Sequence, residues 1–301
     1  MIHIFIVNPR AGMGGFSEQI SRTLAERKDI EYYIFHTRKN VNEKDLVKQI
    51  LFLFEGEKLR FYCCGGQGTL RNVLNGFDDL SQAEIAFLPM GLSNDFIKVF
   101  GDRGKYFNDI NRLIDGEPVR IDYIRSNNGV CLNTFSVGLD ANALKRTNDY
   151  QNLSVIGKLI PFTIGLFGAL FFCKPEKYEI ELDDKVINGK FIEVLFGNGS
   201  NIGGFLCFDK HADIVDGKAH CILVDGVHTF KLFGVAKGLV GAKKQVKHVS
   251  RIDAKKIKIK RRDGGDISIN QDGELLESLP YWEAEIIHEG LSFVLPKGVE
   301  L

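Results

Sequence analysis

The chain has 301 residues, enough for one large or two medium domains, each with its own core. Hydrophobic residues make up 44% of it and charged residues 26%, proportions typical of a soluble globular protein. Its 39 basic and 39 acidic side chains cancel, so no overall positive field indicates nucleic acid as a partner. The six cysteines lack metal-ligand spacing and predict reduced thiols of a cytoplasmic protein, and the first residues lack a signal-peptide pattern.

The first 120 residues alternate between strand-like and helical patterns. Strands are expected over residues 2–7, 30–35, 59–64 and 84–88, and helices over residues 16–28, 43–54 and 70–76. Such alternation predicts a parallel sheet with helices on both of its faces. Ligands of such sheets bind beyond the carboxyl ends of the strands, so the loops at that edge are the first place to look for a site.

Three loops rich in small residues are expected at this edge. The apolar run of the third strand is followed by Gly65-Gly66-Gln67-Gly68-Thr69, and helical spacing resumes at Leu70. Glycines let the backbone come close to a phosphate. The positive end of the helix dipole, at the helix N-terminus, also attracts the negative charge of the phosphate. Asn8 to Gly12 follows the first strand, Thr37 the second, and Pro89 to Asp95 the fourth. An ordinary turn explains any one of these loops, but their convergence favours a nucleotide or another phosphate ligand.

The second half of the chain has a different pattern. Short β-like runs are separated by turn signals such as Asn128-Gly129 and Gly264-Gly265, as in antiparallel hairpins. This pattern predicts a second domain that is all β. The closing run from Leu291 to Pro296 fits either domain.

Two segments bear on membrane association. An insertion at about residues 150–173 contains an uncharged run from Leu159 to Cys173, which is too short for a transmembrane helix. A buried helix explains this run, and so does an apolar wall that receives an acyl chain or touches a membrane. The stretch from Lys237 to Arg262 carries eleven basic residues against one acidic residue. It is either a solvated strand face with alternate lysines on one side or a surface for anionic lipid headgroups.

Carboxylates in turn-like settings are the candidates for chemistry, because phosphoryl transfer needs a cation held by oxygen ligands and a base near the acceptor hydroxyl. Asp272-Gly273-Glu274 follows a strand, and its two acids can face one site as a base and its supporting acid, or form a plain turn. Asp213 and Asp216 suit a hard cation or a solvated turn equally. Patterns of zinc enzymes and serine hydrolases are absent from the sequence.

Taken in order, these segments resemble the diacylglycerol kinase catalytic-domain family, bacterial lipid kinases related to sphingosine kinases and more distantly to NAD kinases. Each match is weak alone, but six in the right order along nearly the whole chain are specific. The matching segments are Asn8-Pro9-Arg10-Ala11-Gly12 for NPxSG, Gly65-Gly66-Gln67-Gly68-Thr69 for GGDGT, Pro89-Met90-Gly91-Leu92-Ser93-Asn94-Asp95 for PxGTxND, Asn133 to Ala141 for NxxSxGxDA, Gly197 to Gly204 for a glycine-rich turn, and Asp272-Gly273-Glu274 for DGE.

The resemblance implies a fold and an activity. An N-terminal three-layer α/β nucleotide-binding domain, similar to that of NAD kinase, is expected over residues 1–120 and 290–301. A C-terminal antiparallel β-sandwich that binds the lipid is expected over residues 121–289. The implied activity is an ATP- and Mg²⁺-dependent kinase that transfers the γ-phosphoryl group to the hydroxyl of a lipid such as diacylglycerol. The implied location is cytoplasmic with peripheral membrane association, and a homodimer is a candidate assembly.

The resemblance also assigns roles to residues. It places the acid–base role on Glu274 with Asp272, which would take the proton from the lipid hydroxyl. It places a structural magnesium near Asp213, Asp216 and the main chain of Lys218. The implied ATP contacts are Asn8, Pro9, Arg10, Ala11, Gly12, Thr37, Gly65, Gly66, Gln67, Gly68, Thr69, Leu70, Arg71, Leu92, Asn94 and Asp95.

Two departures from the family pattern define the alternatives. Gln67 replaces the Asp of GGDGT, and a neutral amide is a poorer ligand for magnesium than a carboxylate. Leu92 replaces a Thr and removes a hydroxyl. A catalytically weakened or silent member that binds nucleotide or lipid is therefore the alternative, although the intact Asp272-Gly273-Glu274 favours activity. A kinase of a soluble hydroxyl such as NAD is disfavoured by the apolar insertion, and an assay for NADP formation tests it.

Overall fold

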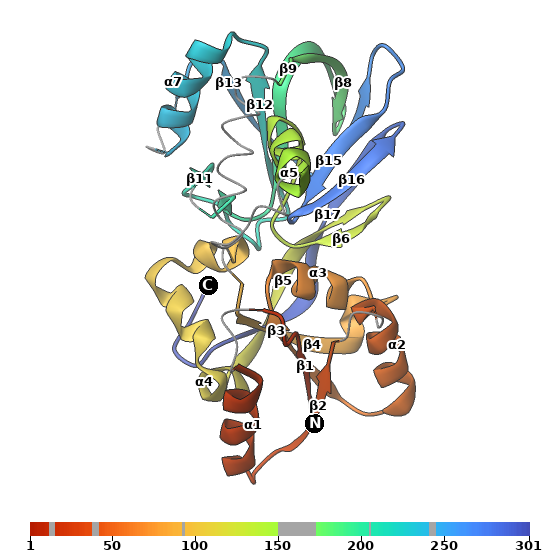
Figure 1. Ribbon diagram of the computed structural model, residues 1–301, viewed down its shortest axis with the longest axis vertical. Coiled ribbons are helices and arrows are strands. Elements are labelled where there is room, and N and C mark those ends of the chain that lie inside the picture. Colours follow the sequence, from red (N-terminus) through yellow and green to blue (C-terminus); the bar gives the residue numbers. More distant parts are fainter. Residues whose placement is uncertain (12–15, 38–41, 92–93, 150–172, 205, 241–244) are drawn as a thin grey trace. The chain divides into compact units, whose positions relative to one another are not determined.

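The computed structural model describes residues 1–11, 16–37, 42–91, 94–149, 173–204, 206–240 and 245–301. It divides into two compact units (Figure 1). Unit 1 comprises Met1–Asp122 and Glu289–Leu301, and unit 2 comprises Tyr123–His288. The sequence predicts these boundaries near residues 120 and 290. Gly12, Leu92 and all of the expected insertion except Cys173 lie outside the described residues.

Unit 1 is built on a parallel sheet with the strand order β17-β4-β3-β1-β2. Its strands are β1 (Ile2–Val7), β2 (Glu31–His36), β3 (Leu59–Gly65), β4 (Ala83–Pro89) and the end of β17 (Trp282–Leu295). Strands β1, β3 and β4 are buried on both faces, which explains why their sequences are continuous apolar runs rather than alternating ones. Phe293 pairs with Ile85, so the closing run of the chain completes this sheet.

Helices flank the sheet of unit 1. They are α1 (Phe16–Glu26), α2 (Glu43–Leu53), α3 (Gln67–Leu74), η1 (Leu80–Gln82), η2 (Asp95–Asn108) and α4 (Ile110–Ile114). Helix α1 packs against α4 and α2 packs against α3, and Figure 1 shows these pairs on opposite sides of the sheet. The predicted three-layer α/β architecture is confirmed. The 3₁₀ segment η2 is not predicted by the sequence, and Gly101 breaks its helical geometry with a positive φ of 55°.

A buried histidine is part of this sheet. The side chain of His3 on β1 is only 7% exposed, and its Nδ1 lies 2.8 Å from the Tyr62 hydroxyl on β3. Burial, assisted by the positive charge of Arg60, lowers the pKa of His3 to about 4.

We expect the free energy of unfolding to fall as the pH drops from about 6.5 to about 4. In this range His3 binds a proton in the unfolded chain but stays neutral in the folded chain. The loss is up to about 3 kcal/mol at the low end of this window. His3→Gln, which keeps a polar partner for Tyr62, should remove this part of the pH dependence. Urea unfolding near neutral pH and at about pH 5 measures it. Identical pH dependence in the native chain and the variant would contradict the assignment.

Unit 2 has a main sheet built from antiparallel strand pairs. Its strands are β5 (Glu117–Ser126, which begins in unit 1), β6 (Gly129–Cys131), β7 (Thr134–Gly138), β8 (Glu176–Leu182), β9 (Lys185–Gly197), β10 (Asn201–Ile202), β11 (Leu206–Cys207), β12 (Ala219–Asp225), β13 (Val249–Ala254), β14 (Lys256–Arg261), β15 (Ile267–Gln271), β16 (Glu274–Leu279) and the start of β17. The strand order is β16-β15-β7-β9-β8-β14-β17, and the long strand β9 also pairs with β12, which pairs with β13. Two helices, α5 (Leu139–Asp149) and α7 (Thr229–Val240), complete the described part. The predicted antiparallel β-sandwich is confirmed.

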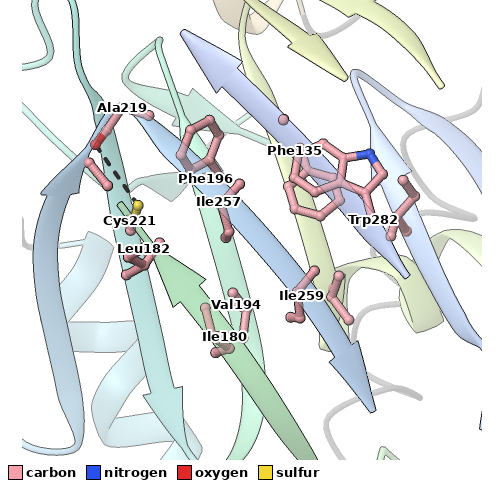
Figure 2. Close-up of a cluster of buried hydrophobic side chains, with 14 of the residues drawn as sticks. Phe135, Ile180, Leu182, Val194, Phe196, Ala219, Cys221, Ile257, Ile259 and Trp282 are labelled. Atoms are coloured by element: carbon pink, nitrogen blue, oxygen red, sulfur yellow. Dashed lines mark hydrogen bonds between the residues drawn. The ribbon is translucent and has the colours of Figure 1, made fainter. Parts of the chain in front are cut away.

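The core of unit 2 is centred on aromatic side chains from three strands. Trp282 is fully buried, stacks on Phe135 and meets Phe196 edge to face (Figure 2). Aliphatic residues of alternate positions on β8 and β14, such as Ile180 and Ile257, line the same core (Figure 2). The indole Nε1 of Trp282 has no hydrogen-bond acceptor among the described residues.

The β14 part of the basic stretch is a strand face whose lysines are paired with acids. On β14, Ile257 and Ile259 point into the core while the lysines point outward, as the alternation predicts. Each outward lysine forms an ion pair with a glutamate of a neighbouring strand: Lys256 with Glu285 at 3.4 Å, Lys258 with Glu283 at 3.6 Å, and Lys260 with Glu179 at 2.7 Å. In this face the lysines therefore do not form an uncompensated cationic patch. Separately, none of the described helices is both long enough and apolar enough to cross a membrane.

Candidate functional site

Three loops of unit 1 meet at the carboxyl edge of its sheet. The strands β1, β3 and β4 are parallel neighbours, so the loops that follow them emerge side by side. The side-chain amide of Asn8 donates to Thr69 Oγ1 at 3.0 Å, and the backbone N–H of Met90 donates to the carbonyl of Gly65 at 2.7 Å. The loops predicted from the sequence therefore lie together.

At two of the glycines the structure leaves no room for a Cβ. A Cβ on Gly65 would lie 2.5 Å from Thr69 Oγ1, and a Cβ on Gly91 would lie 2.8 Å from the Cα of Gly66. A side chain at residue 65 would displace Thr69 within the same loop, and one at residue 91 would push the loops after β3 and β4 apart. Gly66 is also the N-cap residue of α3, and no side chain caps that helix end in the described structure. The N-terminus of α3, with its positive dipole end, can therefore accept an anion.

Gln67 connects two of the loops. Its Oε1 accepts the backbone N–H of Asp95 at 3.2 Å, so the amide holds the start of η2 against the start of α3. Asp95 is buried, with 5% of its surface exposed, and its carboxylate lies 2.9 Å from the ammonium of Lys98. A neutral side chain at residue 67 and an ammonium beside Asp95 limit the negative charge here, which favours an anionic ligand.

The other predicted ATP contacts differ in exposure. Pro9 and Arg10 are exposed, Thr37 directly follows β2 and is buried, and Arg71 is buried and donates to Asn72 Oδ1 at 3.0 Å. Leu70 is buried in the core, so only its backbone can face a ligand. The remaining predicted contacts are placed as follows: Asn8, Ala11, Gly66, Gln67, Gly68 and Asn94 are partly buried, Gly65 and Thr69 are buried, and Gly12 and Leu92 lie outside the described residues.

In unit 2, Asp272 and Gly273 form the two-residue turn between β15 and β16. Both have positive φ, 48° and 83°, the combination that Asp-Gly favours in tight hairpins. The Asp272 carboxylate accepts three backbone N–H groups: those of Leu132 at 2.9 Å and Asn133 at 3.3 Å on Oδ2, and that of Thr134 at 2.9 Å on Oδ1. The segment is thus an Asp-Gly turn that also anchors the loop before β7.

Glu274 occupies a different environment from Asp272. It is the first residue of β16, is paired with Gln271, and is exposed, whereas Asp272 is 7% exposed. Because the Asp272 oxygens face backbone donors, Glu274 is the acid of this pair that solvent and a substrate can reach. Asp272 therefore holds the turn, while Glu274 is exposed at its end.

A buried polar network behind this turn joins Ser136 and Asp140, which belong to the segment Asn133 to Ala141 singled out in the sequence, to Asn270 and Glu193, which sequence reasoning missed. Asp140 Oδ2 accepts the hydroxyl of Ser136 at 2.7 Å and the amide of Asn270 at 2.5 Å. Glu193 Oε2 accepts the backbone N–H of Asp140 at 3.0 Å. Burial, and then the nearby Asp140 charge, raise the pKa of Glu193 well above its ordinary value. The available signal was a lone acid within the apolar run from Phe191 to Phe196.

Asp213 and Asp216 are exposed on consecutive turns. One carboxylate oxygen of Asp213 accepts the N–H of Val215 at 3.0 Å, and one of Asp216 accepts that of Lys218 at 2.9 Å. Each carboxylate has a second oxygen, and two such donors with a main-chain carbonyl fit a hard cation. The described residues contain no group of three or more His, Cys, Asp or Glu side chains able to hold a metal.

Comparisons with known proteins agree for both halves of the chain. Residues 3–126 match the family model described as the diacylglycerol kinase catalytic domain. Residues 133–295 match the model described as the YegS C-terminal NAD kinase beta sandwich-like domain.

Individual relatives match over most of their length. A protein of Staphylococcus epidermidis named diacylglycerol kinase is 26% identical over 278 residues, which cover 91% of this chain and 86% of the relative. A protein of Shewanella frigidimarina named probable lipid kinase YegS-like is 27% identical over 240 residues, 77% of this chain and 75% of the relative. A crystal structure of a putative diacylglycerol kinase from Bacillus anthracis shares the fold with a TM-score of 0.74 and 20% identity, covering 99% of this chain and 98% of that one. The chain therefore belongs to the diacylglycerol kinase catalytic-domain family of bacterial lipid kinases.

Proposed function

We propose that the protein is an ATP-dependent kinase that phosphorylates the hydroxyl of a lipid such as diacylglycerol at a membrane surface. The loops around α3 hold the nucleotide phosphates in unit 1, and Glu274 in unit 2 is the base. The acceptor oxygen bonds to the γ-phosphorus while the bond to the β,γ-bridging oxygen breaks. ADP leaves with that electron pair, and the hydroxyl proton passes to Glu274.

The observation that carries the proposal is the different environment of the two acids in the segment Asp272-Gly273-Glu274. Three backbone donors engage Asp272, and Glu274 next to it is exposed. An arrangement of this kind provides a fixed turn with one accessible acid, as a base for an alcohol requires. The diacylglycerol kinase and lipid kinase names of the relatives support the choice of a lipid acceptor.

Magnesium has two proposed places. Asp213, Asp216 and the main chain of Lys218 would hold a structural ion that fixes their turns. A magnesium ion bound with ATP would neutralise phosphate charge during transfer. At the nucleotide loops this chain offers Gln67 where a carboxylate would be the stronger ligand.

The test is the transfer of labelled phosphate from ATP, with magnesium, to a mixed bacterial lipid extract. We expect one labelled lipid class, and its identity names the acceptor. Absence of any labelled lipid, while the protein still binds ADP, would contradict kinase activity and favour the alternative of a silent nucleotide-binding member.

Gln67→Asp is expected to raise turnover by roughly tenfold and to steepen the magnesium dependence, because it adds an anionic oxygen ligand beside the phosphates. Gln67→Asn is the matched control, since it shortens the side chain equally without adding charge. The phosphate-transfer assay over a magnesium titration measures both. Equal behaviour of the two variants would show that the charge at residue 67 does not limit the enzyme.

A further inference from the structure

The turn that carries Glu274 is held from behind by one buried amide. Asn270 on β15 is 7% exposed, and its Oδ1 accepts the backbone N–H of Gly273 at 2.8 Å. Gly273 directly precedes Glu274, so this bond acts on the peptide next to the base. Asp272 anchors the other side of the same turn through its three backbone donors.

The orientation of the Asn270 amide is determined by its partners. Because Gly273 offers an N–H donor, the atom facing it must be the amide oxygen. The Asn270 Nδ2 then faces Asp140 Oδ2, which must accept. Ser136 Oγ donates to the same oxygen, so both partners of Asp140 Oδ2 are donors. The contact between Asn270 and Asp140 therefore has a single polarity.

Asp140 is itself fixed. It lies at the start of α5, is 8% exposed, and its backbone N–H donates to Glu193 on β9. Pairing of β7 with β15 places Ser136 opposite Asn270, and pairing of β7 with β9 places Gly138 opposite Glu193. The network thus joins three strands and a helix start to the turn.

We propose that Asn270 and Asp140 are positioning residues for Glu274: their hydrogen bond sets the conformation of the turn from which the base projects. This inference rests on the proposed function. Neither side chain has a role in proton transfer. Their effect is on the placement of Glu274, where a shift of about 1 Å can cost about a hundredfold in rate.

A reciprocal exchange tests the proposal. Asn270→Asp keeps an acceptor for Gly273 but puts a second carboxylate against Asp140. We expect kcat to fall by about tenfold or more with an unchanged KM for ATP, since the nucleotide loops belong to unit 1. Combining Asn270→Asp with Asp140→Asn reverses donor and acceptor, restores the hydrogen bond, and should return kcat to within about threefold of native. A double variant no better than the single one would overturn the proposal.

A second measurement does not depend on activity. In Asn270→Asp, repulsion between the two carboxylates should move residue 270 away from Gly273 although it is still an acceptor. Hydrogen exchange at the Gly273 amide, followed by NMR on glycine-labelled protein, should therefore be about tenfold faster in this variant and return to the native rate in the double variant. Unchanged exchange in the single variant would overturn the proposal. Faster exchange with native kcat would also overturn it, because the turn would then not position the base. If the native chain transfers no phosphate, the proposed function fails and Glu274 positioning with it, while the exchange data still establish or exclude the hydrogen bond.

Discussion

We expect Glu274→Gln to lower kcat for phosphate transfer to lipid by about a hundred- to ten-thousandfold, because the substitution removes the base while keeping the size and polarity of the side chain. The side chain is exposed, so the free energy of unfolding should change by no more than about 0.5 kcal/mol. Glu277→Gln, another exposed acid on β16, is the matched control and should retain native kcat. Equal rates for the two variants would show that Glu274 is not the base.

Asp272→Asn is expected to behave differently. An amide at this position must direct an N–H group toward at least one of the backbone donors of Leu132, Asn133 and Thr134. We expect a loss of about 1 to 3 kcal/mol in the free energy of unfolding, together with the loss of activity. Thermal unfolding measured beside kcat separates the two acids: both variants lose activity, and only Asp272→Asn loses stability.

Trp282→Ala should lower the free energy of unfolding by about 3 to 5 kcal/mol, the largest stability effect that we expect in this chain. The side chain is fully buried and stacks on Phe135, so truncation leaves a cavity that the surrounding strands cannot fill. Urea unfolding followed by far-UV circular dichroism measures the loss.

Trp282→Phe is the control for that experiment. It keeps an aromatic ring against Phe135 and removes an indole N–H that has no acceptor among the described residues. Relief of that buried donor offsets the smaller ring, and we expect a change within about 1 kcal/mol. A loss as large as that of Trp282→Ala would mean that the indole N–H is satisfied in solution, for example by a bound water.

Much of the fold could be predicted from local sequence patterns. Continuous apolar runs such as Ile2–Val7 are typical of doubly buried parallel strands, and alternation in Lys256–Arg261 is typical of a strand with one buried face. The segment η2 was not predicted, because Gly101 and Gly104 interrupt its pattern and because 3₁₀ geometry has no strong sequence signal. Helix α5 was not predicted, because its residues after Asp140 are mostly polar and show no clear apolar periodicity.

The candidate site was predictable only where its residues are adjacent in sequence. Gly65 to Thr69 and Asp272 to Glu274 are each a run of consecutive residues, so their spacing alone indicates a shared environment. The contact between Asp140 and Asn270 joins residues 130 positions apart and depends on the register of β7 with β15, which no local pattern contains. For the same reason, the role of Gln67 as an acceptor for Asp95 emerges only from the paired loops.

Trp282 is the only tryptophan of the chain, and it lies in the core of unit 2. Intrinsic tryptophan emission therefore reports the packing of that unit and is silent for unit 1, whose aromatic residues are phenylalanine and tyrosine. A red shift that coincides with the loss of circular dichroism would show that the two units unfold together. Separate midpoints would show two independent transitions. Addition of ADP should then raise only the midpoint of unit 1, which circular dichroism reports and tryptophan emission does not.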